Sequence, residues 1–208
     1  KFVFAPDSVH PHEATGHVLY TQAIVRSLPA LAIANHAPTP HVSHLALDPA
    51  NFERATLVPI TAAKLSAGLV LADMATDAFA KNWSKRLPAM VRLTQPGQSI
   101  EFKFKGTHCE AYDVIGPAGG KVAVTLDGGK PFVVQRIDAY CTYDRLSTFV
   151  IARDLPDAVH SVRLELLPDP IDKAAVLAKN KNKIDKPERF APLEFRPGGL
   201  LLVGELVP

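Results

Sequence analysis

The sequence has no long apolar run and almost no net charge, and each of these absences excludes a class of protein. No stretch of the 208 residues reaches the roughly 18 consecutive apolar residues that a membrane-spanning helix needs. Lys and Arg together number 23 and Asp and Glu 21, so the formal net charge is +2. Non-specific nucleic-acid binding needs a clustered basic surface, which this balance does not favour. We therefore expect neither a membrane span nor a nucleic-acid partner.

What the chain does have is a globular composition with much proline. Apolar residues make up 47% and charged residues 21%, which excludes wholesale disorder and collagen-like repeats. The 18 prolines, against a usual share of about 5%, favour short elements joined by fixed turns. The length suits one domain or two compact ones.

The first 35 residues follow a strand-loop-helix pattern. Residues 1–6 resemble a buried strand, residues 7–12 form a polar turn, and the spacing of Tyr20, Ile24 and Leu28 predicts a helix over 16–28. Pro29 is then expected to stop or kink that helix. The polar turn would lie at the carboxyl end of a strand, where open α/β sheets form their sites. Because the chain begins like a strand entered midway, we expect it to be a piece of a longer protein.

From about residue 97 the apolar residues alternate, which predicts antiparallel strands. The pattern predicts about eight short strands with Gly, Pro and Asp turns. They fall around residues 100–104, 122–126, 132–134, 137–143, 149–152, 162–166, 193–195 and 200–207. The fold class we expect is therefore an α/β fragment over 1–35, a connector over 36–94, and an antiparallel β-sandwich or jelly roll over 95–208.

Two further segments of the sandwich region carry expectations. The lysine-rich stretch 169–189 is interpreted as a solvated loop or frayed helix. Cys109 and Cys141 both have strand-like flanks. We expect two buried, reduced thiols, with a disulfide between neighbouring strands as the alternative.

The densest polar cluster runs from Asp7 to His17, and three interpretations compete for it. An Asp three residues before a His can hydrogen-bond the imidazole and fix its tautomer, which makes Asp7 and His10 a candidate catalytic pair. His10, His12 and His17 with the nearby carboxylates could instead ligate zinc, although their spacing is not typical of a zinc site. The third interpretation is structural, with Asp and His side chains capping the helix.

The same segment resembles the last conserved block of the SGNH, or GDSL-type, hydrolase family. The similarity covers about 30 residues: Asp7-Ser8-Val9-His10-Pro11, then Gly16-His17 and a closing apolar helix. The resemblance implies that His10 is the catalytic base and Asp7 its orienting acid, in an acyl transfer through a serine that requires no cofactor and no metal. The chain departs from the family pattern because it contains no Gly-Asp-Ser and no Gly-x-Asn-Asp sequence. Ser8 is poorly placed to replace the missing nucleophile, so this chain alone is expected to be inactive.

The second half is similar to the β-sandwich appended to some bacterial SGNH esterases. The similarity rests on segments that mostly form turns and core: 97–107, Gly116-Pro117, Asp127-Gly128-Gly129 and His160-Ser161-Val162. The single tryptophan, Trp83, and the tyrosines could form a sugar-stacking platform, or could belong to the core or its rim.

Three functions therefore remain open. The first is the C-terminal portion of an SGNH-type serine esterase that removes acyl groups from carbohydrates, with the missing N-terminal segment as its partner and an acylated carbohydrate or other small ester as substrate. The second is a non-catalytic β-sandwich that binds a glycan or a partner. The third is a metal-dependent hydrolase that uses the histidine cluster. A secreted or periplasmic location is favoured.

Overall fold

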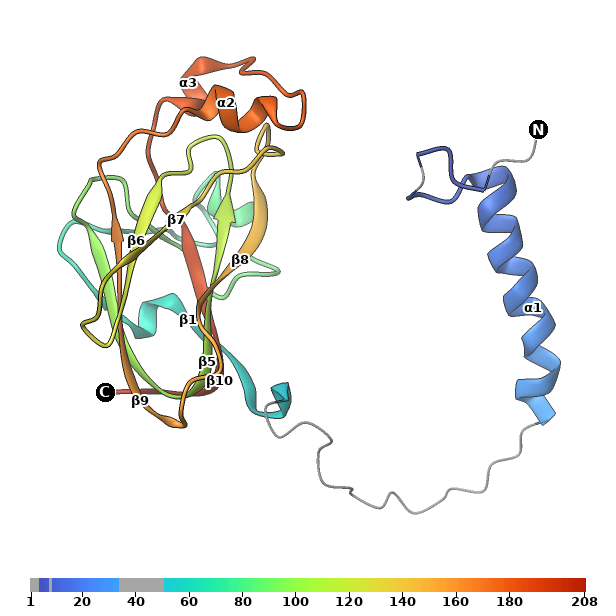
Figure 1. Cartoon of the computed structure of the whole chain (residues 1–208), viewed down its shortest axis with the longest axis horizontal. Helices are drawn as coiled ribbons and strands as arrows, with labels where there is room; N and C mark the ends of the chain where they lie inside the picture. Colours follow the sequence, from blue (N-terminus) through green and yellow to red (C-terminus); the bar gives the residue numbers. More distant parts are fainter. Residues whose placement is uncertain (1–3, 8, 34–50) are drawn as a thin grey trace. The chain divides into compact units, whose positions relative to one another are not determined.

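The structure, a computed structural model, describes residues 4–7, 9–33 and 51–208. The chain divides into two compact units, Lys1–Ala46 and Leu47–Pro208 (Figure 1).

The N-terminal unit consists of a polar loop and one helix. A π-helical turn over Glu13–His17 leads into α1 (Val18–Ile33). Gly16 is buried in that turn, where an added Cβ would lie 2.6 Å from the carbonyl oxygen of Phe4. The lack of a side chain at Gly16 therefore lets the first turn press against the loop.

The strand predicted over residues 1–6 is not present in its described part. Residues 1–3 lie outside the described residues, and Phe4 to Pro6 form a bend and a turn. A strand needs a hydrogen-bonded neighbour, and the described part of this unit contains no other strand.

The helix also continues beyond the expected stop. We predicted that Pro29 would stop or kink it, but α1 runs on to Ile33. Pro29 lies near the end of the helix, so its missing N–H removes a single hydrogen bond to the carbonyl of Val25. The residues that follow, Ala30 and Leu31 among them, are strong helix formers and extend the helix past it.

The C-terminal unit is an antiparallel β-sandwich in which two long strands belong to both layers. The strands are hydrogen-bonded as one continuous sheet, of which one layer has the order β10-β5-β9-β6-β7 and the other the order β1-β10-β5-β8. β2 also pairs with β5, and β3 and β4 pair with each other as a separate two-stranded sheet. The first half of β5 pairs with β9 and its second half with β8, while β10 runs beside most of β5. The strands are β1 (Ala55–Pro59), β2 (Lys64–Leu65), β3 (Val70–Leu71), β4 (Val91–Arg92), β5 (Ser99–Ile115), β6 (Lys121–Leu126), β7 (Phe132–Gln135), β8 (Arg145–Ala152), β9 (Ala158–Leu166) and β10 (Pro197–Val207).

Two facing glycines lie where β5 and β10 pass from one layer to the other. Gly106 and Gly204 are register partners next to a β-bulge, with φ values of +156° and +141°. A Cβ on Gly204 would lie 2.1 Å from the carbonyl oxygen of Lys105, and one on Gly106 would lie 2.2 Å from that of Val203. Only glycine permits both this backbone conformation and this close approach of the strands.

The core between the layers confirms the predicted alternation. Ile100, Phe102 and Phe104 of β5 point inward, and Leu164 and Leu166 of β9 pack with them. The residues between them on β5 face outward as a wetter row, as period-two patterning requires.

The predicted connector over 36–94 is wrong where the structure describes it, because residues 51–94 belong to the sandwich unit. β1 pairs with β10 along its full length, and β2 pairs with β5. Residues 36–50 lie outside the described residues. Strands of two residues, such as β2, β3 and β4, are too short to produce the periodicity by which a sequence reveals a strand.

The predicted strand over 137–143 is also wrong, because this segment is a turn. The Asp138 carboxylate accepts the backbone N–H of Tyr140, and the Cys141 N–H donates to the Asp138 carbonyl. Ile137 and Cys141 are buried, so they mimic the inward positions of a strand. Side-chain capping by Asp competes with strand pairing and favours turns.

The segment 169–189, interpreted from the sequence as a solvated loop or frayed helix, contains ordered helix and is partly buried. It contains α2 (Lys173–Ala178), and α3 (Pro187–Phe190) follows it; Figure 1 shows both at one end of the sandwich. Leu177 and Phe190 pack into a third apolar cluster with Ile115. The Nζ of Lys173 is buried and donates to three backbone carbonyls, each 2.8 Å away, and burial lowers its pKa to about 8.

Both cysteines are buried free thiols, and the alternative disulfide is absent. Cys109 lies on β5 as predicted, whereas Cys141 lies in the turn just described. Burial raises the pKa of the Cys141 thiol to about 11 and that of Cys109 further still. Neither thiol is therefore activated as a nucleophile.

Candidate functional site

Asp7 and His10 form a closely coupled pair in the N-terminal loop. The His10 Nδ1 lies 2.6 Å from the Asp7 Oδ2. The other carboxylate oxygen accepts the backbone N–H of His10 at 2.7 Å and that of Val9 at 3.0 Å, so the loop itself brings the two side chains together. The predicted contact between the Asp7 carboxylate and the His10 ring is present.

The hydrogen bond from His10 and those from the two backbone N–H groups hold the pKa of the Asp7 carboxyl well below its usual range. Asp7 therefore stays ionised and keeps the Nδ1–H tautomer of a neutral His10 ring. The His10 side chain is 82% exposed, and no described residue hydrogen-bonds its Nε2. A neutral imidazole held in this way can accept a proton at Nε2.

The remaining polar residues of this cluster have other positions. His12 caps the π-helical turn, because its Nδ1 accepts the Ala14 N–H at 3.2 Å, so capping is the role of His12 rather than of the Asp7–His10 pair. His17 lies in the last part of that turn. Among the described residues, no three His, Cys, Asp or Glu side chains gather as a metal site would require. Ser8 lies outside the described residues, and no described serine hydrogen-bonds the His10 ring.

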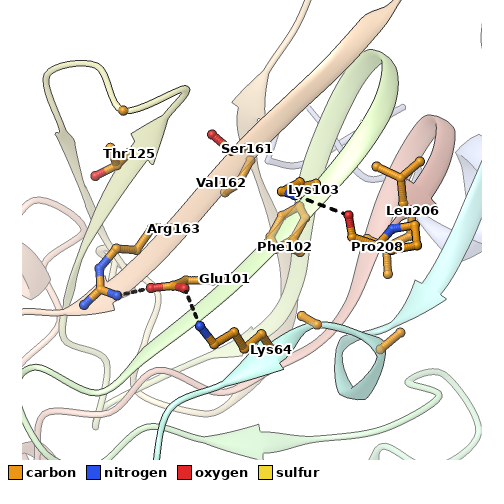
Figure 2. Close-up of a pocket in the computed structure, with 14 residues that line it drawn as sticks. Lys64, Glu101, Phe102, Lys103, Thr125, Ser161, Val162, Arg163, Leu206 and Pro208 are labelled. Carbon is orange, nitrogen blue, oxygen red and sulfur yellow. Dashed lines mark hydrogen bonds and ion pairs between the residues drawn. The ribbon is translucent and has the colours of Figure 1, made fainter.

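The sandwich carries a surface pocket of about 640 Å³. Its walls come from β5, β9, the turn after β6, the end of β10 and the segment before β2. Figure 2 shows Glu101 between Lys64 and Arg163, and the buried side chains of Phe102 and Val162 also line the pocket. This volume is large enough for a small ligand such as a sugar.

The charged groups of this pocket mostly neutralise one another. Glu101 is hydrogen-bonded by Arg163 and, at 3.4 Å, by Lys64, and Arg163 also binds Glu165 at 2.8 Å. The guanidinium of Arg163 lowers the pKa of the Glu101 carboxyl. Lys103 has a different contact, a hydrogen bond of 3.4 Å to the carbonyl of Pro208. No sequence pattern indicates this pocket, because alternation puts Glu101 and Arg163 on solvent-facing sides of their strands without showing that the two strands are neighbours.

Of the two alternatives for Trp83, a sugar platform or the rim of the core, the structure supports the rim. Trp83 is half-buried against a second apolar cluster that includes Leu87, Met90 and Val114, and its ring centroid lies 6.1 Å from that of Phe79. Trp83 therefore belongs to the rim of the core. Tyr140 and Tyr143, by contrast, are exposed.

The comparison with solved structures gives carbohydrate esterases as neighbours of this fold. The crystal structure of a two-domain esterase (CEX) active on acetylated mannans, co-crystallised with mannopentaose, matches with a TM-score of 0.65 at 15% identity, over 99% of this chain and 50% of that chain. A second crystal structure of a two-domain esterase (CEX) active on acetylated mannans matches with a TM-score of 0.64 at 15% identity, over 97% of this chain and 50% of that chain. A family two carbohydrate esterase from Cellvibrio japonicus follows with a TM-score of 0.48 at 12% identity, over 74% and 35%, a score too low to carry an argument.

These likenesses concern the fold, since the identities are low. The chain spans about half the length of the two-domain esterase it matches. No protein-family model and no curated protein matches the sequence. No helix in the described residues is long and apolar enough to cross a membrane.

Proposed function

We propose that this chain is the C-terminal portion of a serine carbohydrate esterase of the SGNH type, in which Asp7 and His10 are two members of the catalytic triad. The substrate class is an acylated carbohydrate, from which the enzyme removes acyl groups. The remaining parts, a serine nucleophile and its oxyanion donors, come from an N-terminal segment outside this chain. A secreted or periplasmic location belongs to the same proposal.

The observation that carries the proposal is the geometry of the Asp7–His10 pair. A carboxylate 2.6 Å from Nδ1, with an exposed ring that leaves Nε2 available, is the arrangement by which a triad orients its base. The low pKa of Asp7 keeps that carboxylate charged, so it also stabilises the imidazolium that forms during the reaction.

The exposed apolar side chains of α1 are a second observation, which supports the proposal that a further segment of the protein packs against this helix. Seven apolar side chains of α1 are between 42% and 67% exposed: Val18, Leu19, Tyr20, Ile24, Val25, Leu28 and Leu31. The helix contains no acidic residue and a single arginine. Apolar side chains that are exposed over most of the surface of a helix are typical of a helix that packs inside a larger domain. The mannan-active esterase has as much chain again outside the part that this sequence matches.

The mechanism assigns one proton path to His10. As the serine oxygen bonds to the acyl carbon, the serine proton passes to Nε2 of His10. When the acyl–oxygen bond to the sugar breaks, Nε2 returns that proton to the sugar oxygen, leaving an acyl-serine. A water molecule then repeats both transfers and releases the free acid. Asp7 holds the ring throughout without taking up the proton.

The proposal is tested by comparing this chain with the intact protein that contains it. Both are assayed on 4-nitrophenyl acetate and on acetylated mannan, with release of acetate as the readout. We expect turnover by the intact protein and none above background by residues 1–208. Esterase activity of the chain alone would contradict an external nucleophile, and an inactive, folded intact protein would overturn the proposal.

A second candidate is a non-catalytic glycan-binding module, in which the Asp7–His10 loop is a remnant. The observation that favours it is the β-sandwich with its surface pocket, which folds as a unit separate from the N-terminal loop and helix. The two candidates differ in the assay above, since a binding module retains glycan affinity but releases no acetate in either form.

A further inference from the structure

Two tyrosines project from one rigid turn at an end of the sandwich. We define the tyrosine loop as residues 136–144. Tyr140 is 55% exposed and Tyr143 is 57% exposed. Neither phenol makes a hydrogen bond or a ring contact with any described residue, although both backbones are held in place. Exposed aromatic rings that no hydrogen bond or neighbouring ring holds, three residues apart on one turn, are available to contact a ligand.

The tyrosine loop is fixed from within by Asp138. Its carboxylate pairs with Arg145 at the start of β8 and accepts the N–H of Tyr140 at 3.0 Å. The backbone N–H of Asp138 in turn donates to the buried Sγ of Cys141 at 3.3 Å. The turn between the two tyrosines is thus closed by hydrogen bonds of Asp138 and Cys141.

The segment with α2 and α3 fixes the tyrosine loop from outside. Asn182 donates to the carbonyl of Ala139 at 2.7 Å, and Arg189 donates to that of Thr142 at 3.1 Å. Arg189 also pairs with Asp144, which Arg196 contacts as well. The backbone on either side of Tyr140 is anchored. A ligand that binds the two rings therefore loses little binding free energy to ordering of the loop.

The charges around the tyrosines restrict the kind of ligand. Asp138 is paired with Arg145, and Asp144 with Arg189 and Arg196, so the charged side chains of the loop itself are paired and the tyrosines present rings and hydroxyls. A flat apolar ring with a phenol at its edge suits a ligand that has an apolar face and many hydroxyls, as a pyranose has. Two half-exposed tyrosines present a contact area on the order of 200 Å², whereas a standard protein interface buries roughly 800 Å² per partner. The area therefore suits a small ligand better than a protein.

We propose that Tyr140 and Tyr143 form a binding site for a neutral glycan chain, separate from the esterase centre and from the charged pocket on the sheet. The choice of a glycan rests on the proposed function. The pocket of Figure 2 is the weaker candidate, because Glu101, Lys64 and Arg163 already satisfy one another and Phe102 is buried.

Binding by the chain of residues 1–208 tests this site without any need for catalysis. Affinity gel electrophoresis is run with soluble mannan, xylan and hydroxyethylcellulose as neutral probes and with polygalacturonate as the anionic probe. The variants are Tyr140→Ala, Tyr143→Ala and the double variant. Two controls accompany them: Phe132→Ala removes an exposed aromatic ring on β7, and Lys103→Ala alters the sheet pocket.

We expect at least one neutral polysaccharide to retard the wild type, the double variant to bind it at least tenfold more weakly, and both controls to bind as the wild type does. Tyr→Phe at each position should retain most of the affinity, since the ring supplies the contact.

The site is overturned if the wild type binds no neutral probe, if the double variant binds normally, or if Lys103→Ala removes the binding. A fall of many degrees in the melting temperature of the Tyr140→Ala and Tyr143→Ala double variant would show a packing role instead and would overturn the site. Binding that persists in an intact protein without esterase activity would sustain this site and refute the esterase.

Discussion

His160 and Asp127 are joined across the turn after β6: the His160 Nδ1 lies 2.8 Å from the Asp127 Oδ2, and the Nε2 of the same buried ring lies 3.0 Å from the carbonyl oxygen of Pro156. Both partners of the ring are acceptors. A neutral imidazole has one N–H and can satisfy only one of them, whereas the imidazolium satisfies both.

The two acceptors make the stability of the sandwich depend on pH. The Pro156 carbonyl and then the Asp127 carboxylate raise the pKa of His160. A raised pKa in the folded state contributes stability that is fully present below the unfolded value of about 6.5 and is lost as the pH rises through the folded value. We therefore expect a lower urea midpoint at pH 8.5 than at pH 5.5.

The single tryptophan, Trp83, lies in the sandwich unit, so its fluorescence follows the unfolding of that unit alone. In the matched variant His160→Gln, the difference between the two pH values should shrink, with an overall loss of about 1 kcal/mol for the altered hydrogen bonds. An equal pH dependence in the variant would show that other groups cause it.

The buried pair Asp113–Arg136 should be sensitive to the loss of one partner. Arg136 donates to both oxygens of Asp113, at 2.6 Å and 2.8 Å, and its guanidinium lies 4.5 Å from the centre of the Phe149 ring. Because Arg136→Ala leaves a buried carboxylate without a counter-ion, we expect a loss of about 3–5 kcal/mol in unfolding free energy.

Arg163→Ala is the matched control for that substitution. Arg163 also binds carboxylates, but it is 40% exposed, so its loss should cost about 1 kcal/mol or less. Urea titration of the three proteins gives the comparison. Similar costs for the two arginines would refute the role assigned to burial.

The crossing of β5 and β10 should tolerate no side chain at Gly204. Gly204→Ala places a Cβ against the Lys105 carbonyl in a backbone conformation that L-residues avoid, and the contact is with backbone that cannot move aside cheaply. We expect insoluble protein or a loss of more than about 3 kcal/mol.

Gly128→Ala is the matched control, because it tests the cost of a positive φ without a close contact of the added Cβ. Gly128 also has a positive φ, +66°, but an added Cβ would have no atom within 4 Å. Its substitution should cost only about 1–2 kcal/mol. Soluble expression and the thermal midpoint of both variants measure the difference, and a Gly204→Ala protein as stable as Gly128→Ala would contradict the close approach.

How far the sequence predicts the fold depends on the length of each element. The alternating parts of β5 and β9, residues 100–104 and 162–166, were predicted correctly because burial of one sheet face forces a period of two, whereas the remaining length of both strands was not predicted. The segment 137–143 was assigned wrongly, since Ile137 and Cys141 are buried from a turn and alternate as strand residues do. β2 and β3 pair over two residues each, which is too few for any pattern.

The candidate sites also differ in how far the sequence predicts their contacts. Asp7 and His10 lie three residues apart, so the local sequence suffices to predict their contact. Glu101, Arg163 and Lys64 come together only through strand register, which one sequence does not contain. The loop that carries Tyr140 is anchored by Asn182, which lies 42 residues later in the sequence. No local sequence pattern therefore indicates that Tyr140 is exposed.

The most direct test of the account is the esterase activity of the intact protein with His10→Ala, measured as kcat/KM on an acetylated mannan beside His17→Ala as the control. His17 lies on the adjoining turn without a triad role, so its variant should retain near-normal activity. We expect His10→Ala to lose at least about 10³-fold, as removal of a triad base does, and Asp7→Asn to lose somewhat less. A His10→Ala protein with near-normal activity, or a wild type that loses all activity when a chelator removes metal, would contradict the assignment of Asp7 and His10 as a catalytic pair.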